Sequence, residues 1–163
     1  MPTPNSSPTD GQSMQDVPLR RSSRLVILDP EGRLLLFRYQ DEHQPTFWST
    51  VGGELLPGED YFAAAERELR EETGFSSPIG SLLRTREEIF AVARSGPHRW
   101  IEQYFLVESE GGGLDRSNWS EEERATIQEW RWWTTDEMRE TNDRFLPDWL
   151  PDLHESTLAE LAR

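Results

Sequence analysis

The segment from Asp60 to Thr73 constrains the fold of this chain most, because it has the composition and the ends of a single amphipathic helix. It contains three consecutive alanines and no internal Gly or Pro, and Gly74 follows at a position where helices commonly end. At about 100° per residue, one narrow arc of the helix carries Phe62, Ala65, Leu69 and Thr73. We therefore expect one face of this helix to pack on a core while the opposite face stays polar.

Apolar runs on both sides of this helix predict β-strands. Leu25–Leu28 and Leu34–Phe37 flank the turn Asp29–Gly32, which predicts a hairpin with a Pro–Gly loop. A further strand is expected over Phe47–Val51, with the following pair of glycines breaking it. More strands are expected at 82–93, 100–108 and 128–133, and further helical segments at 120–125, from Thr134 or Thr135 to Glu140, and at 156–162. Strands that alternate with helices indicate an α/β or α+β domain.

Composition excludes several classes of protein. The chain has 31 acidic and 17 basic residues among 163, which gives a net charge of −14, and no basic patch stands out. Neither a nucleic acid nor an anionic membrane is therefore expected as the principal partner. The absence of Cys excludes disulfides and thiolate chemistry. The apolar runs are far shorter than the roughly 20 residues that span a bilayer, and no signal-peptide pattern is present, so we expect a cytoplasmic protein.

The first residues of the chain differ in composition from the rest. Four of the eleven prolines fall here, among Ser, Thr, Asp and Gln. Such a segment has too little apolar surface to offset the entropy lost on ordering. We therefore expect residues 1–19 to form a flexible arm and residues 20–163 to form a single domain.

Three glutamates share the polar face of the predicted helix. With Phe62 at zero, Glu71 lies near about 180°, Glu68 near about 240° and Glu72 near about 280°. Like charges at these spacings destabilise an exposed helix, so a divalent cation is one way to offset the cost. Carboxylates suit Mg²⁺, Mn²⁺ or Ca²⁺, and protein-bound Mg²⁺ is commonly completed by substrate phosphate oxygens. The alternative is a solvated acidic face that serves solubility alone.

The spacing around these carboxylates is specific. From Gly53 to Phe75 the sequence reads GELLPGEDYFAAAERELREETGF, which matches the pattern G-x5-E-x7-R-E-U-x-E-E-x-G-U at every specified position, where U is a bulky apolar residue. The segment therefore resembles the Nudix box. The resemblance is strong within the box and looser over roughly residues 20–140 as a fold-level match.

This resemblance implies a fold, a cofactor and a set of site residues. The fold is a three-layer α/β/α sandwich around a mixed β-sheet, in which a loop–helix–loop holds a divalent metal, Mg²⁺ or Mn²⁺, against a pyrophosphate. The implied metal ligands are the Gly53 carbonyl and the carboxylates of Glu68, Glu71 and Glu72. Glu59 and Arg67 correspond to an ion pair that orients the helix. Many family members have Glu where this chain has Leu56, a position that the box pattern leaves free.

Similar proteins often use a further Glu outside the box as general base or metal ligand. The loop before Gln128 offers Glu121, Glu122 and Glu123, of which we favour Glu123 and then Glu122. Glu102, at the start of a predicted strand, is a weaker alternative, and a box carboxylate is another. For each residue of the loop trio, a solvated helical turn is an equally good interpretation.

The resemblance also implies the reaction. It is metal-dependent hydrolysis of the pyrophosphate bond in a nucleoside diphosphate derivative, with modified nucleoside triphosphates giving a monophosphate and pyrophosphate as the leading substrate. The alternatives are an ADP-ribose or nucleotide-sugar pyrophosphatase and a sensor of the same fold that binds a nucleotide without cleaving it. All four box glutamates are present, which disfavours the sensor. The partner is then a small-molecule nucleotide, and similar proteins frequently form homodimers.

Other conspicuous residues have a structural interpretation. The Trp residues of the strand at 128–133 are expected in core and helix packing on both faces of the sheet. Arg20, Arg21, Arg38 and Arg99 could contact phosphate, but isolated arginines in an acidic protein are expected to pair with its own carboxylates. The three histidines have no metal-like spacing and are expected at the surface.

Overall fold

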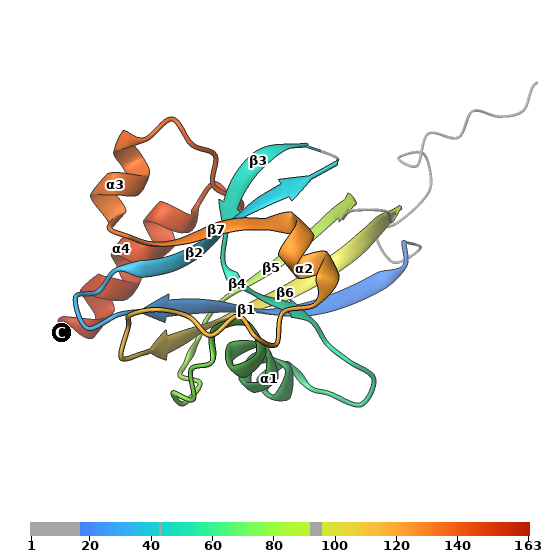
Figure 1. The fold of residues 1–163 in the computed structure, drawn as a ribbon, viewed down its shortest axis with the longest axis horizontal. Coiled ribbons are helices and arrows are strands. Elements are labelled where there is room, and N and C mark those ends of the chain that lie inside the picture. The colour runs from blue at the N-terminus through green and yellow to red at the C-terminus, as the bar shows by residue number, and fades with distance from the viewer. Residues whose placement is uncertain (1–16, 43, 92–95) are drawn as a thin grey trace, which may run out of the picture.

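The computed structural model describes residues 17–42, 44–91 and 96–163. The strands are β1 (Leu19–Leu28), β2 (Leu34–Asp41), β3 (Gln44–Ser49), β4 (Val51–Glu54), β5 (Leu82–Ala91), β6 (Pro97–Glu108) and β7 (Ile127–Trp133), and the helices are α1 (Tyr61–Thr73), α2 (Glu121–Thr126), α3 (Thr135–Glu140) and α4 (Leu150–Leu161) (Figure 1). Of the predicted arm, residues 1–16 lie outside the described residues. Leu19 already belongs to β1, so the first strand starts just before the expected domain boundary.

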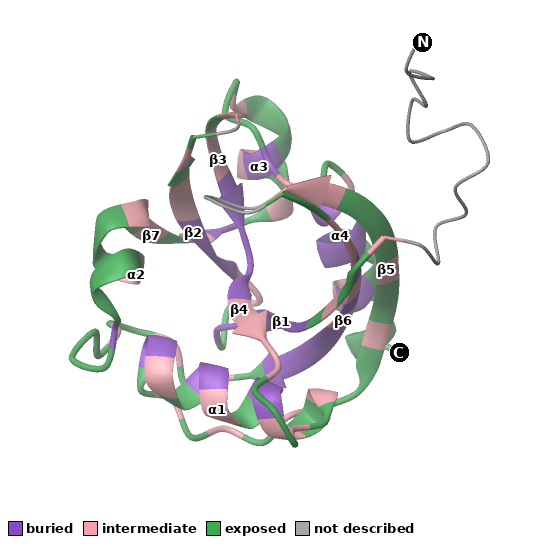
Figure 2. Cartoon of the chain, turned by 90° about the vertical axis from the view of Figure 1, so that its right-hand side faces the viewer, coloured by how far each residue is buried: buried purple, intermediate pink, exposed green. Residues whose placement is uncertain are grey.

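The strands form one mixed sheet that curls. β1 and β6 run parallel from the pair Leu19↔Arg99 to the pair Leu28↔Glu108, and the other pairings between the strands named above are antiparallel. The predicted hairpin is confirmed, but β1 and β2 pair only at Leu28↔Leu34. Beyond that point β4 pairs with β1 while β3 and β7 pair with β2. The two halves of the sheet therefore diverge, as Figures 1 and 2 show.

Helices cover both faces of the sheet. Side chains alternate between the two faces along each strand, so the apolar residues of β1 supply a core on either side. Leu25 and Ile27 of β1 pack in one cluster with Ala65 and Leu69 of α1. Val26 packs in the other cluster; this second cluster also contains Leu28, Met138 of α3, and Leu150 and Leu153 of α4. The order helix, sheet, helix confirms the predicted α/β/α sandwich.

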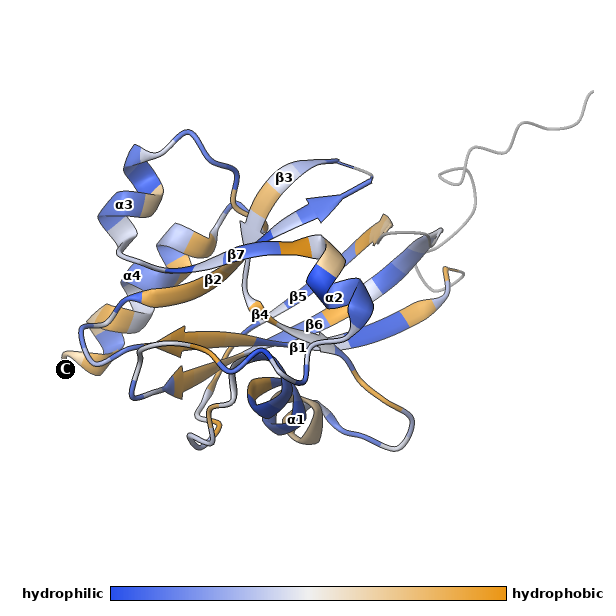
Figure 3. Ribbon diagram, in the orientation of Figure 1, coloured by the Kyte–Doolittle hydropathy of each residue, from blue (hydrophilic) through white to orange (hydrophobic). Residues whose placement is uncertain are grey.

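The apolar core fills only one end of the sheet. The second half of β1, Leu25–Leu28, is buried and apolar, whereas its first half, Arg20–Arg24, is polar. Figure 3 shows this change of hydropathy along β1, and Figure 2 shows the buried segments at the centre of the curled sheet. The polar end is the place where a functional site can form without disturbing the core.

The helix predicted over Asp60–Thr73 is confirmed, with both of its ends determined locally. Asp60 is the N-cap and its carboxylate accepts a hydrogen bond from Ala63 N. Gly74 follows the helix in the left-handed region at φ 79°, a conformation that Gly adopts without steric cost. These caps fix the register of the helix that carries the acidic face.

The prediction that Gly52 and Gly53 break a strand is wrong, because both lie within β4. Gly52 pairs with Arg24 of β1, and a Cβ on Gly52 would lie 2.2 Å from the carbonyl oxygen of Ser23. The glycine therefore permits close approach of two strands rather than ending one. This approach places Gly53, the first residue of the box, against β1.

The last helix is longer than predicted. It begins at Leu150 rather than at residue 156, since Pro151 lies in its first turn, where a missing N–H costs no helical hydrogen bond. The expectation that His154 is a surface residue is wrong. This side chain is 1% exposed and its two ring nitrogens lie 2.8 Å from Thr135 Oγ1 and 2.7 Å from the Gly32 carbonyl oxygen. His98 lies near the surface, and His43 lies outside the described residues.

The expectations for the Trp side chains of β7 and for three of the four arginines are confirmed, whereas Arg21 forms no salt bridge among the described residues. Arg20 pairs with Glu54, Arg38 with Glu129 and Arg99 with Glu87. Trp133 packs in the cluster beside α3 and α4; Trp130 and Trp132 pack on the opposite cluster. Within the described ranges, no helix has the length and apolar character needed to cross a membrane.

Candidate metal centre

Three carboxylates converge at the polar end of the sheet. Glu68 and Glu72 come from α1 and Glu123 comes from α2, and one oxygen from each lies within 4.8 Å of the others. Glu68 and Glu72 are one helical turn apart and are 8% and 2% exposed. The three side chains therefore form a compact group of hard oxygen donors, which we call the carboxylate group.

Tertiary contacts of Trp119 bring α2 beside α1. Its indole Nε1 donates a 2.8 Å hydrogen bond to the carbonyl oxygen of Glu72, and its ring packs at 5.3 Å from that of Phe37. Ser120 then begins α2 with a capping box, in which Glu123 Oε1 accepts a 2.9 Å hydrogen bond from Ser120 N. The second oxygen of Glu123 keeps its lone pairs for another partner.

The electrostatics of the carboxylate group fit a divalent cation. Burial raises the pKa of Glu72 well above its usual range, and the hydrogen bond and charge of Glu68 and the charge of Glu123 raise it further. Glu72 Oε2 is buried and has no hydrogen-bond partner in the described chain. A hard cation such as Mg²⁺ or Mn²⁺ satisfies this oxygen and offsets the mutual repulsion.

Glu71 is placed differently from the other two box carboxylates. Its side chain is 46% exposed and accepts a 3.1 Å hydrogen bond from Arg67 at the rim of the site. The structure thus brings Glu68 and Glu72 together with Glu123 and leaves Glu71 outside that group. The helical angles agree with this arrangement, since Glu71 lies about 100° around the axis from Glu72.

The predicted pair of Glu59 and Arg67 is present. Arg67 Nε and Nη2 donate hydrogen bonds of 2.8 and 3.0 Å to the two oxygens of Glu59, and Nη2 also reaches the Glu54 carbonyl oxygen at 3.1 Å. The hydrogen bond from Arg67 lowers the pKa of Glu59. Arg67 Nη1 in turn contacts Glu68 at 2.8 Å, so this guanidinium joins the loop before α1 to the carboxylate group.

Gly53 lies against Glu68, and this contact gives a testable prediction. A Cβ at Gly53 would lie 2.4 Å from Glu68 Oε1. In Gly53→Ala we expect the Glu68 carboxylate to move, which should lower metal-dependent activity between about 10- and 100-fold with little loss of thermal stability. Gly113→Ala is the matched control, since a Cβ there meets nothing within 4 Å. Equal activity of the two variants would contradict the prediction.

A cavity of about 650 Å³ opens beside the carboxylate group. Both sheet halves, α1 and α2 line it. Tyr39 and Phe47 form a stacked pair on one wall, and Phe90 and Trp100 form another. Of the trio before Gln128, Glu122 and Glu123 line this cavity and Glu121 does not. The cavity offers aromatic surfaces to a ring and cations to an anion.

The weaker alternative, Glu102, also lines the cavity but is already paired. It is 2% exposed and forms salt bridges with Arg24 and Arg86. Burial opposes its ionisation, but the charge of Arg24, the hydrogen bond from Ser22 and the charge of Arg86 together lower its pKa. A carboxylate so held is a poor proton acceptor, so Glu102 is the least suitable of the candidate bases.

Arg24 and Tyr39 both line this cavity, although neither was predicted from the sequence. One signal for Arg24 exists in the sequence. Arg20, Ser22 and Arg24 alternate along a strand that continues into a buried apolar run, so they share one face. Polar residues on the interior face of a strand indicate a polar cavity rather than solvent.

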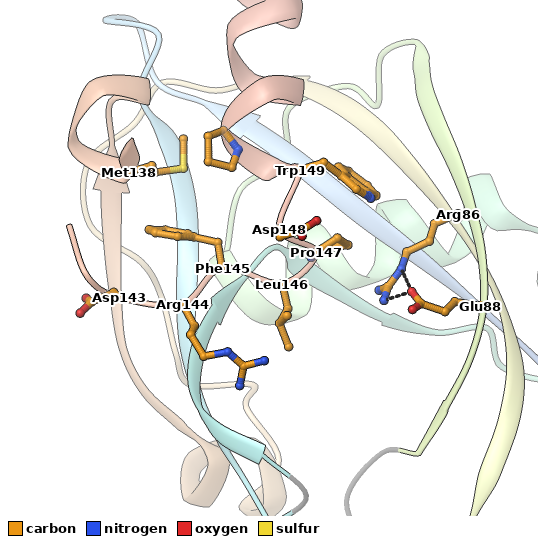
Figure 4. A pocket seen from close by; sticks show the side chains of 11 residues that line it. Arg86, Glu88, Met138, Asp143, Arg144, Phe145, Leu146, Pro147, Asp148 and Trp149 are labelled. Carbon is orange, nitrogen blue, oxygen red and sulfur yellow. Dashed lines mark hydrogen bonds and ion pairs between the residues drawn. The ribbon is translucent and has the colours of Figure 1, made fainter. Parts of the chain in front are cut away.

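A second cavity of about 740 Å³ lies between β5 and residues 143–149 (Figure 4). It shares Arg86, Glu88 and Leu146 with the first cavity. Figure 4 shows Arg86 paired with Glu88 on one side and Trp149 above them. None of the site residues predicted from the sequence lines it, so the carboxylate group assigns the candidate site to the first cavity.

Together, the fold and the carboxylate group define an α/β domain with a candidate centre for a divalent cation. A family model described as the NUDIX domain matches residues 18–153. The chain therefore belongs to the NUDIX domain family, as the box resemblance predicted.

Curated relatives are similar over different shares of their length. The chain is 26% identical over 125 residues to an RNA pyrophosphohydrolase of Novosphingobium aromaticivorans, covering 71% of this chain and 78% of that protein. It is 36% identical over 88 residues to an octanoyltransferase of Myxococcus xanthus, covering 53% of this chain but 24% of that protein. It is also 36% identical over 62 residues to an RNA pyrophosphohydrolase of Pelagibacter ubique, covering 38% of this chain and 39% of that protein. The chain thus spans less than half of the last two relatives.

Solved structures share the fold. A MutT protein from Methanosarcina mazei superposes with a TM-score of 0.66 at 18% identity, covering 91% of this chain and 99% of that one. The dihydroneopterin triphosphate pyrophosphohydrolase of E. coli superposes with a TM-score of 0.62 at 19% identity, covering 86% and 95%. At these identities the likeness concerns the curled mixed sheet and its helices.

Proposed function

We propose that this chain is a divalent-metal-dependent hydrolase that cleaves the pyrophosphate bond of a nucleoside diphosphate derivative, with Mg²⁺ or Mn²⁺ as the cation. The observation that carries the proposal is the carboxylate group with the unpartnered Glu72 Oε2, placed beside a cavity large enough for a nucleotide. Membership of the NUDIX family and relatives named pyrophosphohydrolases support it.

In this proposal each side chain has a separate task. Glu68, Glu72 and Glu123 hold the cation, the Gly53 carbonyl is a further donor, and Glu71 is a rim carboxylate that faces the same cavity. When bound, the cation activates water and offsets charge on the phosphoryl oxygens.

Glu59 and Arg67 act by position rather than by chemistry. Arg67 fixes the loop before α1 onto the helix through Glu59, and it donates a hydrogen bond to one oxygen of Glu68. Glu123 holds the cation through one oxygen only, since its other oxygen accepts the hydrogen bond of the cap from Ser120 N.

The leading substrate is a modified nucleoside triphosphate that yields a monophosphate and pyrophosphate. The two stacked aromatic pairs of the cavity suit a nucleobase. ADP-ribose and nucleotide sugars are the second class of candidates. The 5′ pyrophosphate of RNA is a third, favoured by the names of two relatives and opposed by the net charge of −14.

The test is a panel of these compounds with Mg²⁺ or Mn²⁺ and detection of released phosphate or pyrophosphate. The panel contains modified and ordinary nucleoside triphosphates, ADP-ribose, nucleotide sugars and a short 5′-triphosphorylated RNA. We expect turnover of at least one compound that stops on addition of EDTA and returns with excess metal. Turnover that persists in EDTA would refute the metal mechanism, and nucleotide binding without any turnover would favour a sensor.

A further inference from the structure

The floor of the cavity contains a buried ionic cluster that is separate from the carboxylate group. It consists of Ser22 and Arg24 of β1, Arg86 of β5 and Glu102 of β6, and we call it the floor cluster. The strand register aligns Ser22 and Arg86 on either side of Glu102, and Arg24 follows on the same face. Neighbouring strands of the curled sheet therefore build this cluster, which gives it a rigid frame.

Glu102 is the centre of the floor cluster. Its Oε2 accepts hydrogen bonds from Ser22 Oγ at 2.6 Å and from Arg24 Nε at 2.9 Å, and its Oε1 accepts one from Arg86 Nη1 at 3.0 Å. One carboxylate thus holds two guanidinium groups. Arg86 is also paired with Glu88, which lines the cavity too, so two carboxylates balance the charges of the two arginines.

Arg24 is fixed on one side and open on the other. Nε binds Glu102, and Nη1 donates a 3.2 Å hydrogen bond to the Thr50 carbonyl oxygen. Nη2 has no partner in the described part of the chain. The side chain is 23% exposed and lines the cavity that Glu68 and Glu72 also line. Two nitrogens therefore orient the guanidinium, and the third is left without a partner among the described residues, in a side chain that lines the cavity.

Arg24 lies near the carboxylate group without neutralising it. Its charge acts on Glu72, yet among the described residues its salt bridge goes to Glu102 and none reaches Glu68, Glu72 or Glu123 within 4.0 Å. Its strand partner Gly52 precedes Gly53, which packs on Glu68. A cation held at this place, beside the glycine that precedes Gly53, is available to an anion that also contacts a metal at the carboxylate group.

Resting on the proposed function, we propose that Arg24 binds a non-bridging phosphate oxygen of the substrate diphosphate, and that Glu102 is the positioning residue that aims it. Three carboxylates outweigh the charge of one divalent cation, so an anionic substrate needs further positive charge at the site. A guanidinium with an open edge suits a phosphate oxygen, because its donors match that geometry. Glu102 then has a structural task in the reaction rather than that of a base.

The experiment separates binding of metal from binding of phosphate. The variants are Arg24→Gln, Arg24→Lys and Glu102→Gln, and the matched control is Arg38→Gln, an exposed arginine paired with Glu129 outside the cavity. Mn²⁺ binding is measured by electron paramagnetic resonance, and binding of inorganic pyrophosphate to the Mn²⁺-loaded protein is measured by calorimetry. Thermal unfolding of each variant is recorded in parallel.

We expect Arg24→Gln to leave Mn²⁺ affinity unchanged or tighter, since a repelling cation is lost, and to weaken pyrophosphate binding about tenfold or more. Arg24→Lys keeps the positive charge but not the planar set of guanidinium donors, so it should weaken pyrophosphate binding less than Arg24→Gln does. If Arg24→Gln does not fold, the measurement on Arg24→Lys replaces it. Glu102→Gln should weaken pyrophosphate binding with Mn²⁺ affinity retained, because its arginines lose their anchor.

One result would refute the role of Arg24, and another would refute the metal centre. If Arg24→Gln or a folded Arg24→Lys binds pyrophosphate as well as Arg38→Gln does, the role of Arg24 is refuted while the metal centre stands. If Glu72→Gln, measured in the same series, keeps the Mn²⁺ affinity of the unmodified protein, the proposed metal centre itself fails.

Discussion

Replacing Glu72 with Gln is expected to lower metal-dependent hydrolysis by about 10³-fold, the largest effect of any single change in this chain. Glu72 is the most buried member of the carboxylate group, and its Oε2 has no other partner. Gln keeps the side-chain volume but removes the charge and one anionic oxygen. The site therefore loses a metal ligand and no void opens in the packing around residue 72. The measurement is kcat/KM on the best substrate of the panel, with saturating Mg²⁺ or Mn²⁺.

Stability provides the control for this substitution. The metal-free variant should unfold at the same temperature as the unmodified protein or higher, because Gln removes one of three like charges within 4.8 Å. Added metal should raise the melting temperature of the unmodified protein and leave that of the variant almost unchanged. Glu66→Gln, at an exposed position of the same helix, should keep full activity. A variant that loses activity and stability together would point to misfolding instead.

The sequence predicted the parts of the site that are determined locally. The acidic face of α1 depends on helical spacing, and both ends of the helix depend on its neighbours Asp60 and Gly74, all readable within a few residues. The same holds for the pair of Glu59 and Arg67, because Glu59 directly precedes the N-cap of α1 and Arg67 lies within the first two turns of the helix. Such features require no knowledge of the tertiary structure.

The parts that the sequence left open or missed depend on contacts between distant segments. Glu123 joins Glu72 because the indole of Trp119 binds the end of α1, a contact that local pattern does not contain. Arg24 becomes a cavity residue only when Glu102, far along the chain, pairs with it across β1 and β6. His154 is buried because Gly32 and Thr135 supply partners for both ring nitrogens. In each case the tertiary partner, rather than the residue type, decided the environment.

The second large effect is expected for Glu123, where substitution by Gln should lower kcat/KM by about 10²-fold. Glu123 is the member of its trio whose carboxylate oxygen lies with those of Glu68 and Glu72. The same change at Glu121 or Glu122, both exposed, should alter kcat/KM little. The three variants have the same change of charge, so any long-range electrostatic effect is common to all of them.

The choice of Gln makes this comparison decisive, because Glu123 also has a structural task. Its Oε1 closes the capping box of α2 by accepting a hydrogen bond from Ser120 N. Gln at this position of a capping box preserves that hydrogen bond, whereas Ala would remove both functions at once. If Glu123 served the cap alone, Glu123→Gln would behave like Glu122→Gln, and Glu123→Ala would lose stability without a matching change in metal affinity. A selective loss of activity and Mn²⁺ affinity in Glu123→Gln, with α2 and the melting temperature intact, assigns the free oxygen to the metal centre, since that oxygen is the one group the substitution changes.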